Sequence, residues 1–104
     1  MIHVSRTARY LALSLLAVCS LAVARDLDQD EALKLRQKGI ILPLEQLLET
    51  ALGRHPGARL LEAELELDDG IYIYEIEVVT RTRRVMELEY DATTGELLDV
   101  EEDD

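Results

Sequence analysis

The sequence lacks most of the residue types on which catalytic and metal sites depend. It has a single cysteine, no tryptophan and no phenylalanine. Beyond residue 24 it has no cysteine and no serine, and His55 is its one histidine. Serine and cysteine nucleophiles are therefore excluded there, and a relay through histidine would depend on His55 alone. A zinc site needs several imidazole or thiolate ligands, and beyond residue 24 His55 is the one candidate. We expect no enzyme activity, no metal centre and no cofactor.

Positive charge is also scarce. The chain has 11 basic and 22 acidic residues, a net charge of −11. Arg6 and Arg9 lie in the first 24 residues, which contain no acid, so the rest of the chain carries 9 basic against 22 acidic residues and a net charge of −13. This charge repels DNA, RNA and anionic lipid surfaces, so we expect no nucleic-acid partner. It favours cationic partners, or solubility alone.

Residues 1–24 have the pattern of a signal peptide. Arg6 and Arg9 form a positively charged start, and residues 11–24 form an apolar run that ends in the small-x-small pattern Ala-Val-Ala, with cleavage expected after Ala24. The run of about 14 residues is too short to cross a hydrocarbon layer of ~30 Å as a helix. We therefore expect a periplasmic or secreted protein with no membrane span after cleavage.

A lipoprotein is the alternative, with Cys19 as the lipidated residue, but Val18 before it is bulkier than that processing prefers. After cleavage about 80 residues remain, a size at which a domain is marginally stable without help. Disulfides cannot supply that help, because Cys19 is the only cysteine and lies within the signal. Stability must come from apolar packing, a partner or a dimer.

The capping pattern of residues 25–39 predicts a short helical segment. Asp28 suits the N-cap, Glu31 can return a hydrogen bond to it, and Gly39 is the expected stop. The Asp-x-Asp-x-Asp spacing at its start resembles the opening of a calcium loop. The rest of that pattern fails, because Glu31 stands where glycine must turn and Gln37 where a bidentate acid is needed. We therefore interpret these acids as helix-capping residues.

A second helix is expected to begin with Pro43 as its first residue and to end at Gly53. Its apolar residues recur at the spacing of one helix face, so it should cover the apolar side of the sheet. Pro56-Gly57 then turns the chain into the first strand.

Residues 58–91 alternate between apolar and polar side chains, which is typical of strands. Turns are expected at residues 68–70, 80–83 and 93–95, and a short fourth strand at 97–100. One face of this sheet is expected to carry Leu61, Ala63, Leu65, Leu67, Tyr72, Tyr74, Ile76, Val78, Met86, Leu88 and Tyr90. The prediction is an α+β fold, with N-terminal helices packed on one face of a 3–4-stranded antiparallel β-meander. The α+β domain spans residues 40–100, and an acidic, disordered tail is expected at 101–104.

The opposite face of the sheet is dominated by carboxylates, and we call it the acidic face. Neighbours ~5 Å apart across strands repel by about 3 kcal/mol at an effective dielectric constant of 20. Such a face either meets something cationic, such as a basic protein surface, a cationic peptide or divalent ions, or is simply solvated and keeps the sheet soluble. Catalysis by a carboxylate pair is disfavoured, because exposed acids lack the burial that raises a pKa toward neutrality. Its candidate residues are Glu62, Glu64, Glu66, Glu75, Glu77, Glu87, Glu89 and Asp91.

Several segments together resemble the PepSY domain family. Residues 44–48 and the following Pro56-Gly57 are similar to its helix and turn, residues 74–78 to its Tyr-Glu-Val strand, and residues 91–98 to its Asp-Ala-x-Thr-Gly-Glu ending. The resemblance spans residues 43–100. It departs from the family at residues 80–83, where no Asp-Gly or Asn-Gly marks the turn.

The resemblance implies a non-catalytic module on the export side of the membrane. Such domains occur in protease propeptides, where they inhibit or assist folding, and in small envelope proteins linked to signalling. We therefore expect a binding module that regulates a protease or an envelope sensor, and the alternative is sequestration of divalent cations or cationic peptides by the acidic face. No family binding residue transfers to a position in this chain, and whether the domain dimerises stays open.

Overall fold

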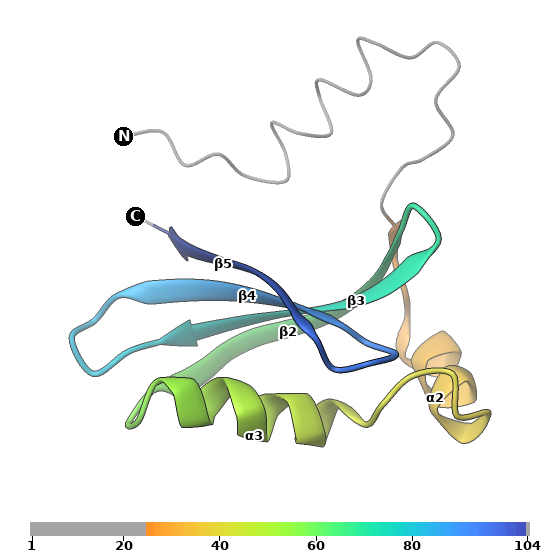
Figure 1. Cartoon of the computed structure of the whole chain (residues 1–104), viewed down its shortest axis with the longest axis horizontal. Coiled ribbons are helices and arrows are strands. Elements are labelled where there is room, and N and C mark those ends of the chain that lie inside the picture. Colours follow the sequence, from red (N-terminus) through yellow and green to blue (C-terminus); the bar gives the residue numbers. More distant parts are fainter. Residues whose placement is uncertain (1–24, 104) are drawn as a thin grey trace, which may run out of the picture.

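Residues 25–103 form a five-stranded antiparallel sheet with two helices (Figure 1). The computed structural model describes residues 25–103, so the predicted signal peptide lies outside the described residues. The sheet has the strand order β1-β2-β3-β4-β5, and the α+β class is confirmed. The elements are β1 (Arg25–Asp26), α2 (Gln29–Gln37), α3 (Leu44–Arg54), β2 (Arg59–Asp68), β3 (Ile71–Val79), β4 (Val85–Asp91) and β5 (Leu97–Asp103).

The strand register follows the predicted alternation. The hairpin between β2 and β3 closes with the two residues Asp69 and Gly70, both at positive φ (54° and 81°), as a type I′ turn requires. This turn aligns Leu65 with Tyr74, which in turn pairs with Tyr90 on β4. Residues that pair directly across strands share a face, so the apolar positions of the three strands lie on one side.

That apolar side is covered by α3, which runs along the sheet (Figure 1). Leu47 and Ala51 of α3 are 2% and 0% exposed, and they belong to the same cluster as Ile76 and Leu88, both 0% exposed. The spacing of four between Leu47 and Ala51 puts both on one face of the helix. The remaining buried members of the cluster are Ile41, Leu65, Tyr74, Val78, Tyr90 and Ala92.

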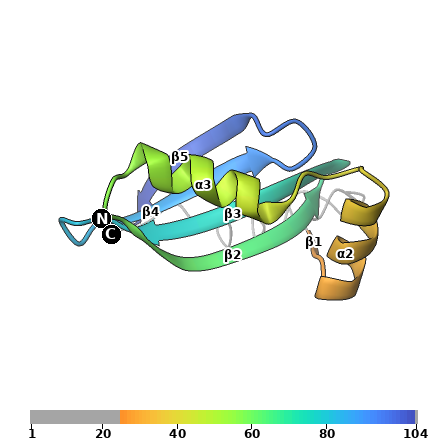
Figure 2. The same cartoon turned by 90° about the horizontal axis from the view of Figure 1, so that it is seen from below.

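The first helix has the predicted caps but little share in the core. Asp28 Oδ1 accepts a hydrogen bond from Glu31 N at 2.8 Å, and Glu31 Oε1 accepts one from Asp28 N at 3.3 Å. This reciprocal capping box supports interpreting these acids as capping residues. No residue of α2 is buried, and the helix lies beside β1 at one end of the sheet (Figure 2).

Three details of α3 and β2 differ from the sequence prediction. Pro43 is the N-cap, with ψ 138°, instead of the first helical residue, and α3 continues through Gly53 to Arg54. Leu61 is 52% exposed and lies at a register shift between Leu60 and Glu62, because a β-bulge there breaks the alternation.

The sheet is also larger than the expected three or four strands. A two-residue β1 pairs with the end of β2, and β5 continues to Asp103 instead of stopping at Val100. Residues 101–103 therefore form part of the sheet and not a disordered tail. They pair with β4, where Glu101 lies opposite Glu87 and Glu102 opposite Met86.

The buried phenols of Tyr74 and Tyr90 differ in their hydrogen bonding. Tyr74 donates its hydroxyl to Leu42 O at 2.8 Å, whereas the Tyr90 hydroxyl has no partner among residues 25–103. We expect Tyr74→Phe to lower the free energy of unfolding by about 1 kcal/mol, because it leaves a carbonyl without its donor. Tyr90→Phe should leave stability unchanged or raise it. Urea unfolding of the two variants measures the contrast, and an equal loss in both would contradict it.

The same phenols predict a loss of stability at alkaline pH. Burial raises the pKa of Tyr74 and of Tyr90 above 10.0, with smaller effects from Arg36 and Glu45 on Tyr74 and from Arg54 on Tyr90. The neutral phenol is therefore favoured by folding. Its contribution is complete below pH 10 and is lost as pH rises through the higher pKa of the folded state. Thermal midpoints should fall above about pH 10, and the double variant Tyr74→Phe/Tyr90→Phe should flatten that fall.

Candidate functional site

The register brings the predicted acidic face together across three strands, β2, β3 and β4. Glu64, Glu75 and Glu89 are direct cross-strand partners, and so are Glu62, Glu77 and Glu87. Because cross-strand partners lie about 5 Å apart, each set forms a continuous row of carboxylates. β5 extends both rows, since Asp99 pairs with Glu89 and Glu101 with Glu87. The sequence prediction missed Glu101 because it ended the last strand at Val100, and it missed Asp99 because the alternation was followed only to Asp91.

Three residues of the acidic face are buried, which corrects the expectation of exposed acids. Glu66 is 1% exposed, Glu75 5% and Glu89 9%. One carboxylate oxygen of each lies within 4.8 Å of those of the other two. Glu66 is offset from the direct row, and its side chain reaches the other two from a diagonal position on β2. Alternation predicts which face a side chain occupies, but not how deeply it is enclosed.

Three carboxylates this close together favour a positive charge between them. At 4.8 Å, two unit charges repel by about 3.5 kcal/mol at an effective dielectric constant of 20. Oxygen ligands from several carboxylates suit hard cations such as Ca²⁺ and Mg²⁺. The Glu66–Glu75–Glu89 cluster is therefore the part of the acidic face with the geometry to hold an ion.

Asp91 pairs with Ile73 on the same face as Glu89, and its side chain also has a structural role in a turn. Its Oδ1 accepts hydrogen bonds from Thr93 N at 2.8 Å and Thr94 N at 3.1 Å, and Gly95 N donates to its carbonyl at 2.8 Å. Ala92 N donates to Tyr72 O at 2.8 Å. The Asp-Ala-Thr-Thr-Gly segment is thus a side-chain-capped turn joining β4 to β5.

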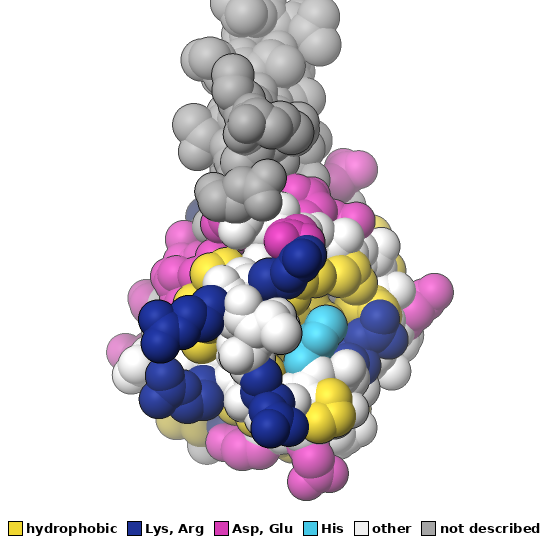
Figure 3. Space-filling model, turned by 90° about the vertical axis from the view of Figure 1, so that its left-hand side faces the viewer, with side chains coloured by type: hydrophobic (Ala, Val, Ile, Leu, Met, Phe, Trp, Pro, Cys, Tyr) yellow, Lys and Arg dark blue, Asp and Glu magenta, His cyan; other side chains and the backbone are white. Residues whose placement is uncertain are grey.

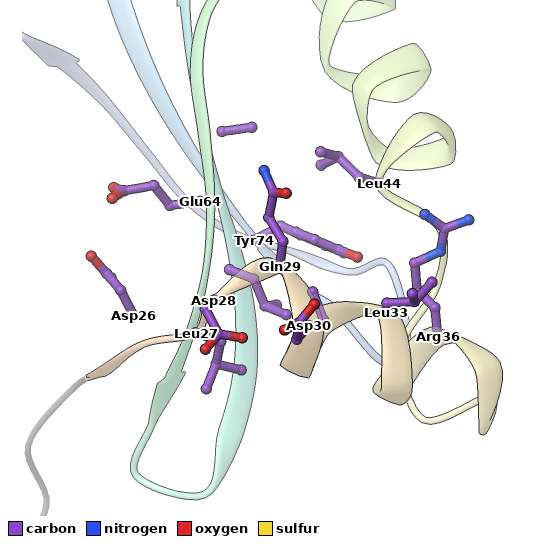
Figure 4. A pocket seen from close by; sticks show the side chains of 13 residues that line it. Asp26, Leu27, Asp28, Gln29, Asp30, Leu33, Arg36, Leu44, Glu64 and Tyr74 are labelled. Atoms are coloured by element: carbon purple, nitrogen blue, oxygen red, sulfur yellow. The ribbon is translucent and has the colours of Figure 1, made fainter.

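A pocket of about 540 Å³ lies where α2, the start of α3 and the β2 edge meet (Figure 4). Glu64 and Asp26 lie on one side of it, and Leu33 and Leu44 on the other. Glu64 also belongs to the acidic face, so the pocket and that face adjoin. An apolar wall facing acidic side chains suits a ligand side chain with an apolar stem and a positive end.

The carboxylate rows predict that salt stabilises the fold. Salt shortens the Debye length from about 30 Å at 0.01 M to about 10 Å at 0.1 M, which weakens the repulsion between exposed carboxylates. We expect the thermal midpoint to rise by a few degrees over this range of NaCl, as about 0.5–1 kcal/mol would produce in a domain this small. The double variant Glu77→Gln/Glu87→Gln should show a smaller rise. A flat or falling midpoint for the unsubstituted protein would contradict the charge argument.

No helix within residues 25–103 is long and apolar enough to cross a membrane. His55, the one histidine of this region, is the C-cap of α3 and has no second histidine or cysteine near it in residues 25–103. His55 thus lies where the chain leaves α3.

Comparison with known proteins identifies the family to which the chain belongs. Residues 41–101 match the PepSY family model, described as "Peptidase propeptide and YPEB domain". The chain is also similar to "Uncharacterized protein YkoJ" of Bacillus subtilis (strain 168), with 33% identity over 75 residues. That alignment covers 72% of this chain and 44% of YkoJ, so the chain spans less than half the length of this relative. No solved structure gives a significant match. Because the family match covers more than half of the sequence, the protein belongs to the PepSY family, which is known for protease-propeptide and regulatory roles.

Proposed function

We propose that this protein is a non-catalytic binding module that regulates a protease or an envelope sensor by contacting it with the acidic face. The observation that carries the proposal is the cross-strand register, which sets two rows of carboxylates side by side over β2 to β5. A sheet surface with this charge is complementary to a basic protein surface, and such complementarity gives both orientation and fast association. The family description supports a protease as the partner.

The composition supports binding over catalysis. Residues 25–103 contain no serine and no cysteine, and they contain one histidine. A covalent mechanism through those nucleophiles is therefore excluded in this part of the chain. A module that acts by binding to the surface of a partner protein needs no nucleophilic side chain. We further propose that the protein works in the periplasm or outside the cell, as the pattern of residues 1–24 indicates.

Crosslinking in envelope extract tests the proposal. The protein should capture a protease or a sensor protein, identified by mass spectrometry. Glu77→Gln/Glu87→Gln should lose most of this capture, because both residues lie in one cross-strand pair of the acidic face. The control is Glu45→Gln/Glu49→Gln, which removes the same charge from exposed positions of α3. Equal capture by both variants would rule out the acidic face as the contact.

The second candidate is cation binding at the Glu66–Glu75–Glu89 cluster, favoured by the convergence of three carboxylate oxygens within 4.8 Å. Titration with Ca²⁺ or Mg²⁺, followed by NMR, should then shift the amides around Glu66, Glu75 and Glu89. Glu75→Gln should abolish the shifts, while Glu49→Gln should preserve them. Unchanged spectra at millimolar ion concentrations would exclude this alternative.

A further inference from the structure

Positive charge gathers at the end of the molecule farthest from α2. Figure 3 shows dark blue side chains around the histidine at this end. More than half of the lysines and arginines of residues 25–103 lie there, and all of them are arginines. They come from the end of α3, the start of β2 and the β3–β4 turn. We call this group the arginine end: Arg54, Arg59, Arg81, Arg83 and Arg84.

The arginine end surrounds a pocket of about 460 Å³. Arg54, Arg81 and Arg84 line it, together with His55. The hydroxyl-bearing residues Thr80 and Thr82, the apolar Pro56 and Met86, and Glu102 complete its lining. Guanidinium groups and hydroxyls around one concave surface are the donors that proteins use for carboxylate and phosphate oxygens.

The backbone holds the β3–β4 turn in a defined shape. Arg84 N donates to Thr80 Oγ1 at 3.0 Å, and Thr80 N donates to Arg84 O at 2.8 Å. The stem of Arg81 packs so closely on Gly57 that a Cβ at Gly57 would overlap it. Arg83 has a φ of 65°, a conformation that glycine or asparagine adopts more readily. Folding alone would favour glycine at that position, so an arginine there suggests a role for its charge.

Most of this charge is not neutralised within the described chain. Arg84 Nη1 contacts Glu102 Oε1 at 3.1 Å and Oε2 at 3.2 Å. Among residues 25–103, Arg54, Arg81 and Arg83 form no ion pair. The Arg84–Glu102 contact shows that the pocket accommodates a carboxylate. Arg54 and Arg81, which also line the pocket, can bind further carboxylates.

We propose that the arginine end binds an acidic peptide segment of a partner protein. Several guanidinium groups from three chain segments form an extended surface, which matches a run of carboxylates better than it matches one small anion. The site is separate from the acidic face and selects the opposite charge. It therefore does not depend on the proposed function, and either can fail alone.

The net negative charge of the protein does not prevent this contact. The Debye length is about 10 Å at 0.1 M salt, so distant charges are largely screened. Met86, which lines the pocket, pairs with Val78 on the apolar face, whereas Glu77 and Glu87 project from the opposite face of the sheet. The pocket therefore faces away from the nearest row of carboxylates.

Fluorescence anisotropy with a labelled hexaglutamate peptide tests the proposal on the full chain. The measurement is made at 0.1 M salt, where the Debye length is about 10 Å. The peptide should bind, and Arg54→Gln/Arg81→Gln should weaken binding about tenfold or more, equivalent to losing one or two charge-assisted contacts. Lys34→Gln/Lys38→Gln is the control, since it removes the same charge from α2 and its C-cap at the other end. Its affinity should match that of the unsubstituted protein.

Two further variants separate binding from folding. Glu102→Gln should tighten binding, because it releases Arg84 from its contact with Glu102. Arg83→Gly should keep the thermal midpoint, because glycine readily adopts the positive φ of this position. The same variant should weaken peptide binding, because it removes the positive charge of the arginine. The proposal is overturned if the peptide does not bind, or if the arginine and lysine variants lose affinity equally. Binding of inorganic phosphate with the same arginine dependence, but not of peptide, would also overturn it.

Discussion

Ile76→Ala is expected to lower the free energy of unfolding by about 2–5 kcal/mol. Ile76 is 0% exposed at the centre of β3, under the part of α3 that contributes Leu47 and Ala51. Truncation removes apolar contacts and leaves a cavity that the surrounding sheet can fill only in part. A domain of about 80 residues has about 4–12 kcal/mol of total stability, so this one change can unfold much of the population. Urea unfolding monitored by circular dichroism measures the loss.

The same strand supplies a matched control. Ile71 is 46% exposed at the beginning of β3, and Ile71→Ala removes the same atoms from a position where water already contacts them. Its effect should stay within about 0.5 kcal/mol, as expected for a surface substitution. Equal losses for Ile71→Ala and Ile76→Ala would show that α3 does not cover this face of the sheet.

Asp91→Ala is expected to cost about 1.5–3 kcal/mol, the range for hydrogen bonds to a charged group. The substitution removes the carboxylate oxygen that accepts from Thr93 N and Thr94 N. The turn also orients Ala92, whose carbonyl accepts from Leu42 N at 2.8 Å. Loss of the turn should therefore loosen the connection that leads into α3 as well as the β4–β5 hairpin. Thermal unfolding measures the effect.

Asp91→Asn distinguishes the turn from a charge effect. Asparagine keeps an oxygen acceptor in the same place and favours the same turn, so it should retain most of the stability. Asp99→Ala is the second control, since Asp99 is exposed and pairs with Glu89 in a carboxylate row. We expect it to be neutral or slightly stabilising. If Asp91→Asn were as damaging as Asp91→Ala, the negative charge would matter more than the acceptor.

Local patterns predicted much of the fold. The capping box at Asp28 and Glu31 was predicted correctly, because a cap depends on residues three positions apart. The turn at Asp69-Gly70 was predicted for the same reason, since two adjacent residues suffice to form it. The Asp-Ala-x-Thr-Gly segment at residues 91–95 carries part of the resemblance to the PepSY family. The capping role of Asp91 was not predicted, because alternation gives the face on which a carboxylate lies but not the backbone groups that donate to it.

The errors lie where distant parts of the chain meet. The last strand was predicted to stop at Val100 because acidic residues follow, yet pairing with β4 continues β5 to Asp103. The prediction of solvated acids failed at Glu66, Glu75 and Glu89, since enclosure depends on the surroundings of the whole face. The bulge at Leu61 is likewise a property of the pairing between two strands.

The sequence by itself determined which side chains lie on the same face, because the two-residue period of a strand is a local property of the backbone. It therefore separated apolar from acidic positions across β2, β3 and β4. Only the tertiary structure decided that the short β1 joins the sheet, how deeply each acid is enclosed, and that arginines from three separate segments meet at one end. Those outcomes depend on contacts between residues far apart in the chain, which no local period encodes.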